Sequence, residues 1–362
     1  MPSCGIIGLP MVGKTTVFNL LTGTRKETSK FFTGKTESNQ GLAAVRDRRV
    51  DFLANLYRPR KTTYAQIEFV DVPGLVRGAS EGLGVGNTFL DGIRQVDALV
   101  HVVRAFAADL EHVEGSVDPL RDVHTIAYEL LMADVSFVDK RLSRLNEGKK
   151  RSAQTEQEIE LLTRILTHLE SEQPFSTFAL LPEEEKLLTS YTFLTGKPLI
   201  MVVNLDDEQF VTGTYPRKEE LQSYAEERGL PLLEMSANTE LEVSELDGPE
   251  RDEFLAELKL DVPGIDRVAR ASYQVLGLIS FFTVGEDEVR AWTVRAGTTA
   301  KQAAGKIHSD LERGFIRAEV MRYADLESYG SAVKLKEKGL VSLEGKDYIV
   351  SDGDICSIRF NV

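Results

Sequence analysis

The chain has 362 residues, enough for two or three domains and a substantial buried core. Hydrophobic residues make up 42% and charged residues 28%, which excludes an intrinsically disordered chain and indicates a folded globular protein. The formal net charge is −14, so a surface that attracts nucleic acid everywhere is excluded. Any RNA contact must therefore come from a local basic patch.

Neither a membrane span nor a disulfide framework is expected. No apolar run approaches the about 18 residues that a spanning helix needs, and the first residues lack the basic flank and cleavage site of a signal peptide. The two cysteines, Cys4 and Cys356, lie at opposite ends of the chain and indicate neither a disulfide nor a metal site. A reducing, cytoplasmic location is the simplest interpretation.

The first elements predicted are a strand over residues 3–7 and a helix after it. Between them lies the pattern Gly8-x4-Gly13-Lys14-Thr15, which is that of a P-loop. Its glycines let backbone N–H groups surround phosphates, and the helix N-terminus adds a favourable dipole. Lys14 supplies positive charge for the β- and γ-phosphates, and Thr15 offers a hydroxyl to Mg²⁺. The pattern also occurs by chance, but its position between strand and helix favours a P-loop.

A second strand is predicted over residues 67–73. Asp71 stands at its end, 57 residues after Lys14, where a carboxylate can reach Mg²⁺ through water. Gly74 follows three residues later and frees a backbone N–H for the γ-phosphate. Asp-x-x-Gly alone is also typical of an ordinary turn. Together with the P-loop it predicts a nucleotide hydrolase with a switch.

Apolar runs over residues 98–103 and 198–204 predict two more strands, and strands alternating with helices indicate a parallel sheet. Asn204-Leu205-Asp206-Asp207 ends the later strand, where a GTPase carries the base-reading loop Asn-Lys-x-Asp, so Leu205 replaces the lysine. Ser236 and Ala237, which begin 32 residues after Asn204, stand in the place of a second base-contacting loop. An ordinary strand-to-loop turn is the alternative.

Residues from about 120 to 190 have a helical pattern, with leucines and other apolar residues at steps of three and four. The polar segment NEGKKRSAQ divides them, which predicts two antiparallel helices. Two ordinary crossover helices are the alternative. Between residues 140 and 151, near the tip, six basic residues and a single acid, Glu147, give a local charge of +5. The basic residues are Lys140, Arg141, Arg144, Lys149, Lys150 and Arg151. This cluster predicts either a solvated face or a contact with an RNA phosphate backbone.

Beyond about residue 265 the pattern changes to short strands with one helix. Strand-like runs cover residues 278–284, 289–294 and 315–321, and the last one lies within 347–362. The helical stretch covers residues 300–314. These elements predict a small α+β module.

The segments GIIGLPMVGKTTVFNLLTG and FVDVPGLVRGASEGLGVGNTFLDGIRQVDALVHVVRAF closely resemble the YchF-type Obg-like ATPases of the translation-factor GTPase class. So do VEGSVDPLRDV, RAWTVRAGTTAKQAAGKIHSDLERGFIRAEV and LEGKDYIVSDGDICSIRFNV. The resemblance implies an α/β P-loop NTPase G domain with a parallel sheet over 1–120 and 191–275. It also implies an inserted helical hairpin over 121–190 and a C-terminal α+β β-grasp (TGS) domain over 276–362. The family prefers ATP to GTP and binds ribosomes.

The resemblance also implies the site residues. Nucleotide-binding residues are Met11, Val12, Gly13, Lys14, Thr15, Thr16, Asn204, Leu205, Asp207, Ser236 and Ala237, and two Mg²⁺ ligands are Thr15 and Asp71. The family's third ligand is a threonine at the position of Lys35, so Thr36, with Thr33 as the alternative, is expected to replace it. The backbone of Leu205 contacts adenine in this scheme, and a lysine there is expected to shift preference toward GTP. Because the family usually has glutamate where this chain has Asp207, GTP stays a second candidate nucleotide.

Catalysis needs a group that orients water, and Leu75, which follows Asp-x-x-Gly, cannot form that hydrogen bond. The resemblance implies a histidine from a mobile loop instead, and His112 matches that position. A solvated loop histidine is the alternative. His101, inside an apolar run, is interpreted as a core residue. The expected catalytic set is His112, Lys14 and Gly74.

The function predicted from the sequence is a cytoplasmic ATPase that hydrolyses ATP, or also GTP, to the diphosphate and phosphate and thereby regulates ribosome association. Ribosomal RNA is expected to bind the hairpin tip and the TGS domain, with no membrane or DNA partner. The alternative is a ribosome- or RNA-binding module gated by nucleotide, with incidental hydrolysis. A small-molecule kinase is disfavoured because Asn204 and Ser236 resemble base-reading loops.

Overall fold

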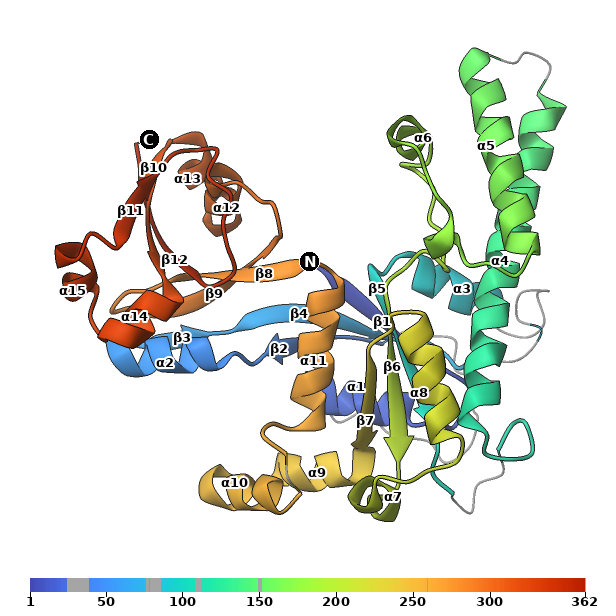
Figure 1. Ribbon diagram of the computed structural model, residues 1–362, viewed down its shortest axis with the longest axis horizontal. Coiled ribbons are helices and arrows are strands. Elements are labelled where there is room, and N and C mark those ends of the chain that lie inside the picture. The colour runs from blue at the N-terminus through green and yellow to red at the C-terminus, as the bar shows by residue number, and fades with distance from the viewer. Residues whose placement is uncertain are drawn as a thin grey trace. The chain divides into compact units, whose positions relative to one another are not determined.

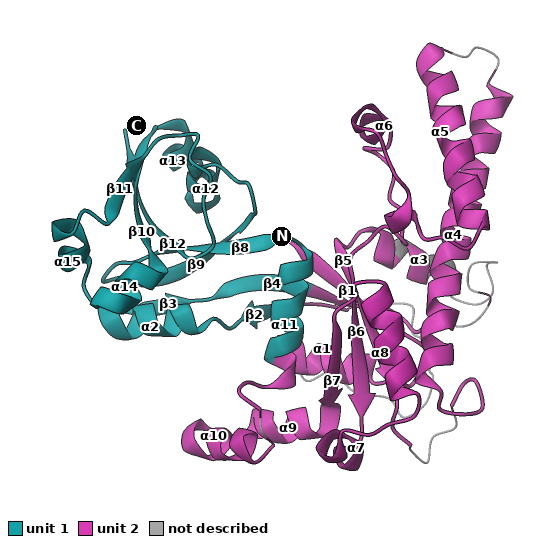
Figure 2. Cartoon of the chain, viewed as in Figure 1, with its two compact units in different colours: residues 1, 42–68, 266–362 teal, residues 2–41, 69–265 magenta. Residues whose placement is uncertain are grey.

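The computed structural model describes residues 1–24, 39–75, 78, 86–107, 112–148, 152–258 and 260–361. The chain divides into two compact units (Figure 2). The larger unit contains residues 2–41 and 69–265, and the smaller contains residue 1, 42–68 and 266–362. Residues 42–68, which the sequence analysis assigns to the nucleotide domain, thus group with the C-terminal residues.

A six-stranded sheet in the order β2-β4-β1-β5-β6-β7 positions the predicted site (Figure 1). Its strands are β1 (Ser3–Ile7), β2 (Asn39–Val45), β4 (Ala65–Asp71), β5 (Ala98–Arg104), β6 (Leu199–Leu205) and β7 (Leu232–Ser236). Strands β1, β5, β6 and β7 pair in parallel. Because β1 and β5 are buried along their whole length, they form the continuous apolar runs that a sheet covered on both faces requires.

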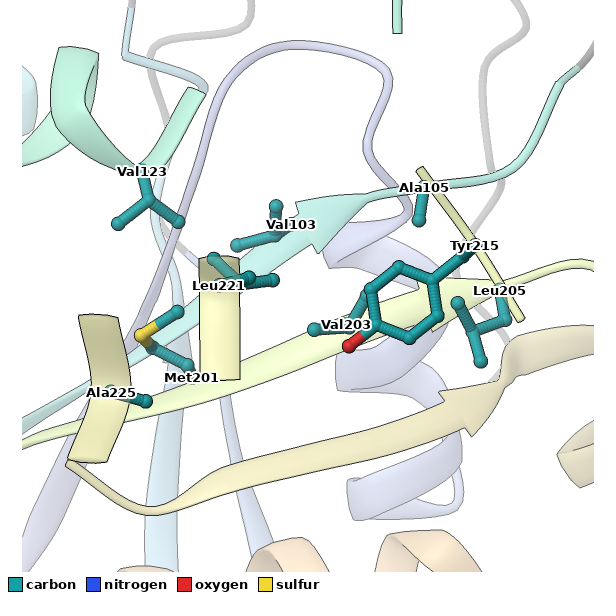
Figure 3. Close-up of a cluster of buried hydrophobic side chains, with 9 residues drawn as sticks. All are labelled: Val103, Ala105, Val123, Met201, Val203, Leu205, Tyr215, Leu221 and Ala225. Carbon is teal, nitrogen blue, oxygen red and sulfur yellow. The ribbon is translucent and has the colours of Figure 1, made fainter. Parts of the chain in front are cut away.

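Helices cover this sheet and extend from it. They are α1 (Lys14–Thr22), α3 (Gly86–Arg94), α4 (Pro119–Glu147), α5 (Ala153–Glu170), α6 (Pro182–Leu187), α7 (Asp207–Thr212), α8 (Lys218–Glu227), α9 (Ala237–Glu245) and α10 (Gly248–Glu257). Figure 3 shows side chains of β5 and β6 packed against Val123 of α4 and against Leu221 and Ala225 of α8. These two helices therefore cover one face of the sheet.

The expected helical hairpin is present. Leu131, Val138 and Leu142 of α4 share one hydrophobic cluster with residues of α5, and the two helices lie side by side in Figure 1. Residues 171–190 differ from the expected helical pattern, because they form only the short turn Phe175–Thr177 and the six-residue helix α6. A proline precedes the turn and another begins α6, and proline cannot donate within a continuing helix.

The smaller unit is the expected α+β module together with residues 42–68. Its sheet has the order β11-β10-β12-β8-β9-β3: β3 (Lys61–Thr63), β8 (Leu278–Thr283), β9 (Glu288–Arg295), β10 (Phe315–Arg322), β11 (Val341–Glu344) and β12 (Asp354–Phe360). Its helices are α2 (Arg48–Tyr57), most of α11 (Gly264–Val275), α12 (Ala300–Ile307), α13 (Ser309–Arg313), α14 (Tyr323–Tyr329) and α15 (Ala332–Glu337). Ala300 and Ala303 of α12 pack on Phe281 and Val294 of the sheet. Among the described residues, no helix is both long and apolar enough to span a bilayer.

Candidate nucleotide site

The loop between β1 and α1 has the backbone that a phosphate-binding loop needs. Gly8 has a φ of 148° and Gly13 a φ of 97°, a region that side chains disfavour. A Cβ atom on Gly8 would lie 2.4 Å from the carbonyl oxygen of Val102, and one on Gly13 would lie 2.4 Å from Nδ2 of Asn204. Both positions therefore require glycine. Met11, within the same loop, also has a positive φ of 64°.

Lys14 lies inside this loop. Its Nζ donates hydrogen bonds to the carbonyl oxygens of Gly8, at 3.1 Å, and Leu9, at 2.6 Å. Burial lowers the pKa of Lys14 to about 8, and the charge of Asp71 opposes that shift. A Cβ atom on Gly74 would lie 3.1 Å from Nζ, so Gly74 is adjacent to the lysine. The structure thus brings Lys14 and Gly74, two of the three expected catalytic residues, together.

Thr15 and Asp71 meet directly. Thr15 Oγ1 donates a hydrogen bond of 3.0 Å to Oδ2 of Asp71, which is buried at the end of β4. A hydroxyl and a carboxylate are the oxygen ligands that Mg²⁺ prefers, so this pair fits the expected ion. Thr16 follows, half-buried on α1. Thr36, the third expected ligand, lies outside the described residues.

Asn204 connects the phosphate loop to the predicted base-binding loop. Its Nδ2 donates to the carbonyl oxygen of Val12 at 3.1 Å, and its Oδ1 accepts from the amide of Ala237 at 3.1 Å. The Asn204 side chain is buried, so both bonds are shielded from water. Three of the predicted nucleotide-binding residues, far apart in sequence, therefore lie together.

Asp207 holds the start of α9. Its Oδ1 accepts from the hydroxyls of Ser236, at 2.6 Å, and Thr239, at 2.9 Å. Ser236 in turn accepts from the amide of Thr239 at 3.2 Å and so caps the helix. Thr239 could not be predicted as part of this site, since a threonine in the first turn of a helix has no distinctive sequence pattern.

Leu205 directs its side chain into the core. The residue is 3% exposed and packs in the cluster that contains Val203 and Tyr215 (Figure 3). Only the backbone of Leu205 is therefore available to a nucleotide base. A lysine at this position would place its ammonium group among apolar side chains, which the sequence pattern alone does not reveal.

His112 is buried against the first turn of α4. Its Nδ1 accepts from the amide of Glu114 at 3.1 Å, and its Nε2 lies 2.9 Å from Oδ2 of Asp122. Asp122 Oδ1 also accepts from Arg121, at 3.0 Å from Nε and 2.7 Å from Nη2. The His112 side chain is 3% exposed, so the solvated-loop alternative is wrong for this structure. Residues 108–111, which precede it, lie outside the described residues.

Two other predictions concern residues around the site. His101 is buried in β5, and burial, followed by the charge of Lys14, lowers its pKa to about 3, in agreement with a core residue. At the hairpin, Arg141 pairs with Glu158 at 2.6 Å, while Lys140 and Arg144 are exposed. The remaining basic residues of the tip, Lys149, Lys150 and Arg151, lie outside the described residues.

Two family models match parts of this chain. The family model described as "50S ribosome-binding GTPase" matches residues 3–133. A second model, YchF-GTPase_C, described as "Protein of unknown function (DUF933)", matches residues 278–361.

Curated relatives match along nearly the whole chain. The protein named ribosome-binding ATPase YchF of Bacillus subtilis is 42% identical over 363 residues, which is 99% of each chain. The protein of the same name from Haemophilus influenzae is 42% identical over 361 residues, again 99% of each chain. A solved structure of the Schizosaccharomyces pombe YchF GTPase is 34% identical, covers 99% of this chain and 97% of its own, and superposes with a TM-score of 0.86. Because sequence and fold agree over this full length, the chain belongs to the YchF family of P-loop nucleotide hydrolases.

Proposed function

We propose that this chain binds ATP, hydrolyses it to ADP and phosphate, and associates with ribosomes in a manner that depends on the bound nucleotide. The observation that carries the proposal is the phosphate end of the site. There Lys14 Nζ is held by loop carbonyls beside Gly74, and the Thr15 hydroxyl contacts Asp71. The names of the relatives, ribosome-binding ATPase YchF, support both parts of the proposal.

Thr15 and Asp71, with Thr36 as a further candidate, would hold Mg²⁺. When bound, the ion neutralises charge on the β- and γ-phosphates. Lys14 would exchange the carbonyl oxygens of Gly8 and Leu9 for phosphate oxygens, and this exchange keeps the buried ammonium group paired. The amide of Gly74 would donate to the γ-phosphate.

Water orientation is assigned to His112. Leu75, where many related hydrolases have glutamine, is buried and its side chain has no polar atom. An imidazole nitrogen can hold or polarise the attacking water. This assignment rests on the family resemblance.

The base end favours ATP. Guanine recognition needs a carboxylate that accepts two N–H donors, but one oxygen of Asp207, Oδ1, already accepts two hydroxyls, from Ser236 and Thr239. A guanine base that used both carboxylate oxygens would have to compete with those bonds at Oδ1. Adenine would instead be recognised by backbone groups near Leu205. ATP should therefore bind more tightly than GTP.

The basic hairpin tip is the proposed contact with ribosomal RNA, with the C-terminal module as a second contact. Lys140 and Arg144 are exposed there. Lysine and arginine contacts with phosphates release counterions and so make binding salt-dependent. A ribosome-binding protein works where ribosomes are, so we assign the chain to the cytoplasm.

The test of hydrolysis compares the wild type with Lys14→Ala, measuring ATP affinity and phosphate release. The variant should lose nucleotide binding or hydrolysis, because the positive charge at the phosphates is gone. Lys218→Ala is the matched control, since Lys218 pairs with Glu234 on the same unit and is not in the loop. Undiminished phosphate release in Lys14→Ala would show that the P-loop assignment is wrong.

The test of ribosome binding reverses charge at Lys149, Lys150 and Arg151. Cosedimentation with ribosomes over a range of KCl should show weaker binding and a shallower salt dependence, while the ATPase rate of the free protein is unchanged. Reversal at Arg217 and Arg228, two half-exposed arginines outside the hairpin, is the control. An unchanged salt slope would exclude the tip. Turnover that ribosomes do not accelerate would favour the alternative of a binding module with incidental hydrolysis.

A further inference from the structure

The ring of His112 has no nitrogen available for a water molecule. Nδ1 accepts from the amide of Glu114, so the ring proton lies on Nε2. Nε2 in turn lies 2.9 Å from Oδ2 of Asp122, and the ring is 3% exposed. A histidine that orients water must present one of these two nitrogens to it. The position seen here therefore cannot perform that step.

The partners of His112 form a compact dock, which we define as the Glu114 amide, Asp122 and Arg121. Arg121 binds the carboxylate of Asp122 and also fixes the loop, because its Nη2 donates to the Ser116 carbonyl at 2.7 Å and its Nη1 to the Ser116 hydroxyl at 3.0 Å. Asp122 is itself 2% exposed. The carboxylate is therefore held by Arg121 as well as by its contact with His112.

The contact between the ring and the carboxylate is close but poorly directed. Nε2 of His112 and Oδ2 of Asp122 are both buried and lie 2.9 Å apart, yet neither atom forms a well-oriented hydrogen bond. Electrostatic attraction and packing hold the ring in place, without the directional bond that would add further stability. Such a contact is one that the ring can leave when a better partner is offered.

We propose that Asp122 is a positioning residue that keeps His112 docked. Only those protein molecules in which the ring has left the dock then hydrolyse ATP. This inference rests on the proposed function, because it takes His112 as the group that orients water. The rate of hydrolysis is then proportional to the undocked fraction, whereas ATP affinity does not depend on it.

Asp122→Asn is the principal test, because it keeps the shape of the side chain and removes the charge that attracts the ring. We expect kcat for ATP hydrolysis to rise about threefold to tenfold with KM unchanged, as a shift toward the undocked state predicts. Asp139→Asn is the matched control. It makes the same change at an exposed position of the same helix, outside the dock. Its kcat should equal that of the wild type.

Dependence on His112 separates this proposal from a general loosening of the fold. His112→Ala alone should lower kcat, and adding Asp122→Asn to it should have no further effect. In protein labelled with ¹⁵N-histidine, the signal lost in His112→Ala should show the proton on Nε2 in the wild type and a mixture of tautomers in Asp122→Asn. If Asp122→Asn does not fold, Asp122→Glu, which keeps the charge but displaces the carboxylate, is expected to raise kcat in the same way.

Three outcomes would overturn the proposal. They are a fall of kcat in Asp122→Asn, a rise that persists without His112, and an unchanged tautomer signal. If His112→Ala hydrolysed ATP at the wild-type rate, His112 would not orient water, and the proposed role of Asp122 would be wrong as well. The proposed hydrolysis itself would still stand or fall with Lys14→Ala, so the two failures are distinguishable.

Discussion

The phosphate end of the site is formed mainly by backbone atoms, whereas the base end is formed by side chains that bind one another. At the phosphate end, backbone atoms and one lysine do the positioning, and glycines at positions 8 and 13 permit the close approach of neighbouring chain. At the base end, side chains hold one another, as Asp207 holds Ser236 and Thr239. At the phosphate end, a side-chain atom added to either glycine would collide with neighbouring residues. At the base end, the hydrogen bonds between side chains determine which polar groups remain free to bind a base.

The largest expected effect tests whether position 205 belongs to the base end or to the core. Leu205→Lys should lower the free energy of unfolding by about 3–5 kcal/mol, the cost of an uncompensated buried charge. Leu205→Met, which conserves volume, should cost under about 1.5 kcal/mol. Urea unfolding measures both. A stable lysine variant with normal unfolding would return position 205 to the base end.

Gly13→Ala tests the phosphate end. The new Cβ would require a φ of 97° and would collide with Asn204, so we expect a loss of about 2–3 kcal/mol in stability. ATP affinity should fall at least about tenfold, which corresponds to 1.4 kcal/mol. Gly23→Ala is the control, because its φ is also positive but no atom lies within 4 Å of the added Cβ. Equal ATP affinity in both variants would show that the close approach is unimportant.

His101 makes the strand beneath the phosphate loop sensitive to acid. Its pKa is about 3 in the folded chain and about 6.5 when unfolded, so the unfolded state binds the proton between these values. The stability that depends on the neutral ring is present above pH 6.5 and is lost as the pH falls toward 3. His101→Gln should therefore lose about 2 kcal/mol less stability than the wild type between pH 7 and pH 5. If the free energy of unfolding had the same pH dependence in the wild type and in His101→Gln, this prediction would be wrong.

The smallest effect concerns base selectivity. Asp207→Glu displaces the carboxylate from the guanine-reading spacing, so the ratio of ATP to GTP affinity should rise about threefold, which is under 1 kcal/mol. Competition titration with both nucleotides measures the ratio. A wild-type protein that prefers GTP outright would show that Asp207 reads guanine despite its bonds to Ser236 and Thr239.

Local patterns explain what the sequence could predict. The P-loop lies within eight consecutive residues, and β1, β5 and β6 are continuous apolar runs, so motif and periodicity were sufficient for them. Contacts between distant segments were beyond such patterns. Asp122 looks like an ordinary acidic residue in the first turn of a helix, and nothing in its spacing pairs it with His112. The side chain of Leu205 points to the core because β6 is covered on both faces, which a motif comparison does not show.

Strand β3 affects how the C-terminal module can be prepared as a separate fragment. Its three residues pair in parallel with β9, from Lys61 beside Glu288 to Thr63 beside Arg290, and the Thr63 hydroxyl donates to Glu288 at 2.6 Å. A fragment that starts near residue 276 would lack β3 and leave the N–H and C=O groups of β9 unpaired on that side at Glu288, Val289 and Arg290. Open edges of this kind recruit other chains. The C-terminal module should therefore stay soluble only when residues 42–68 are supplied with it.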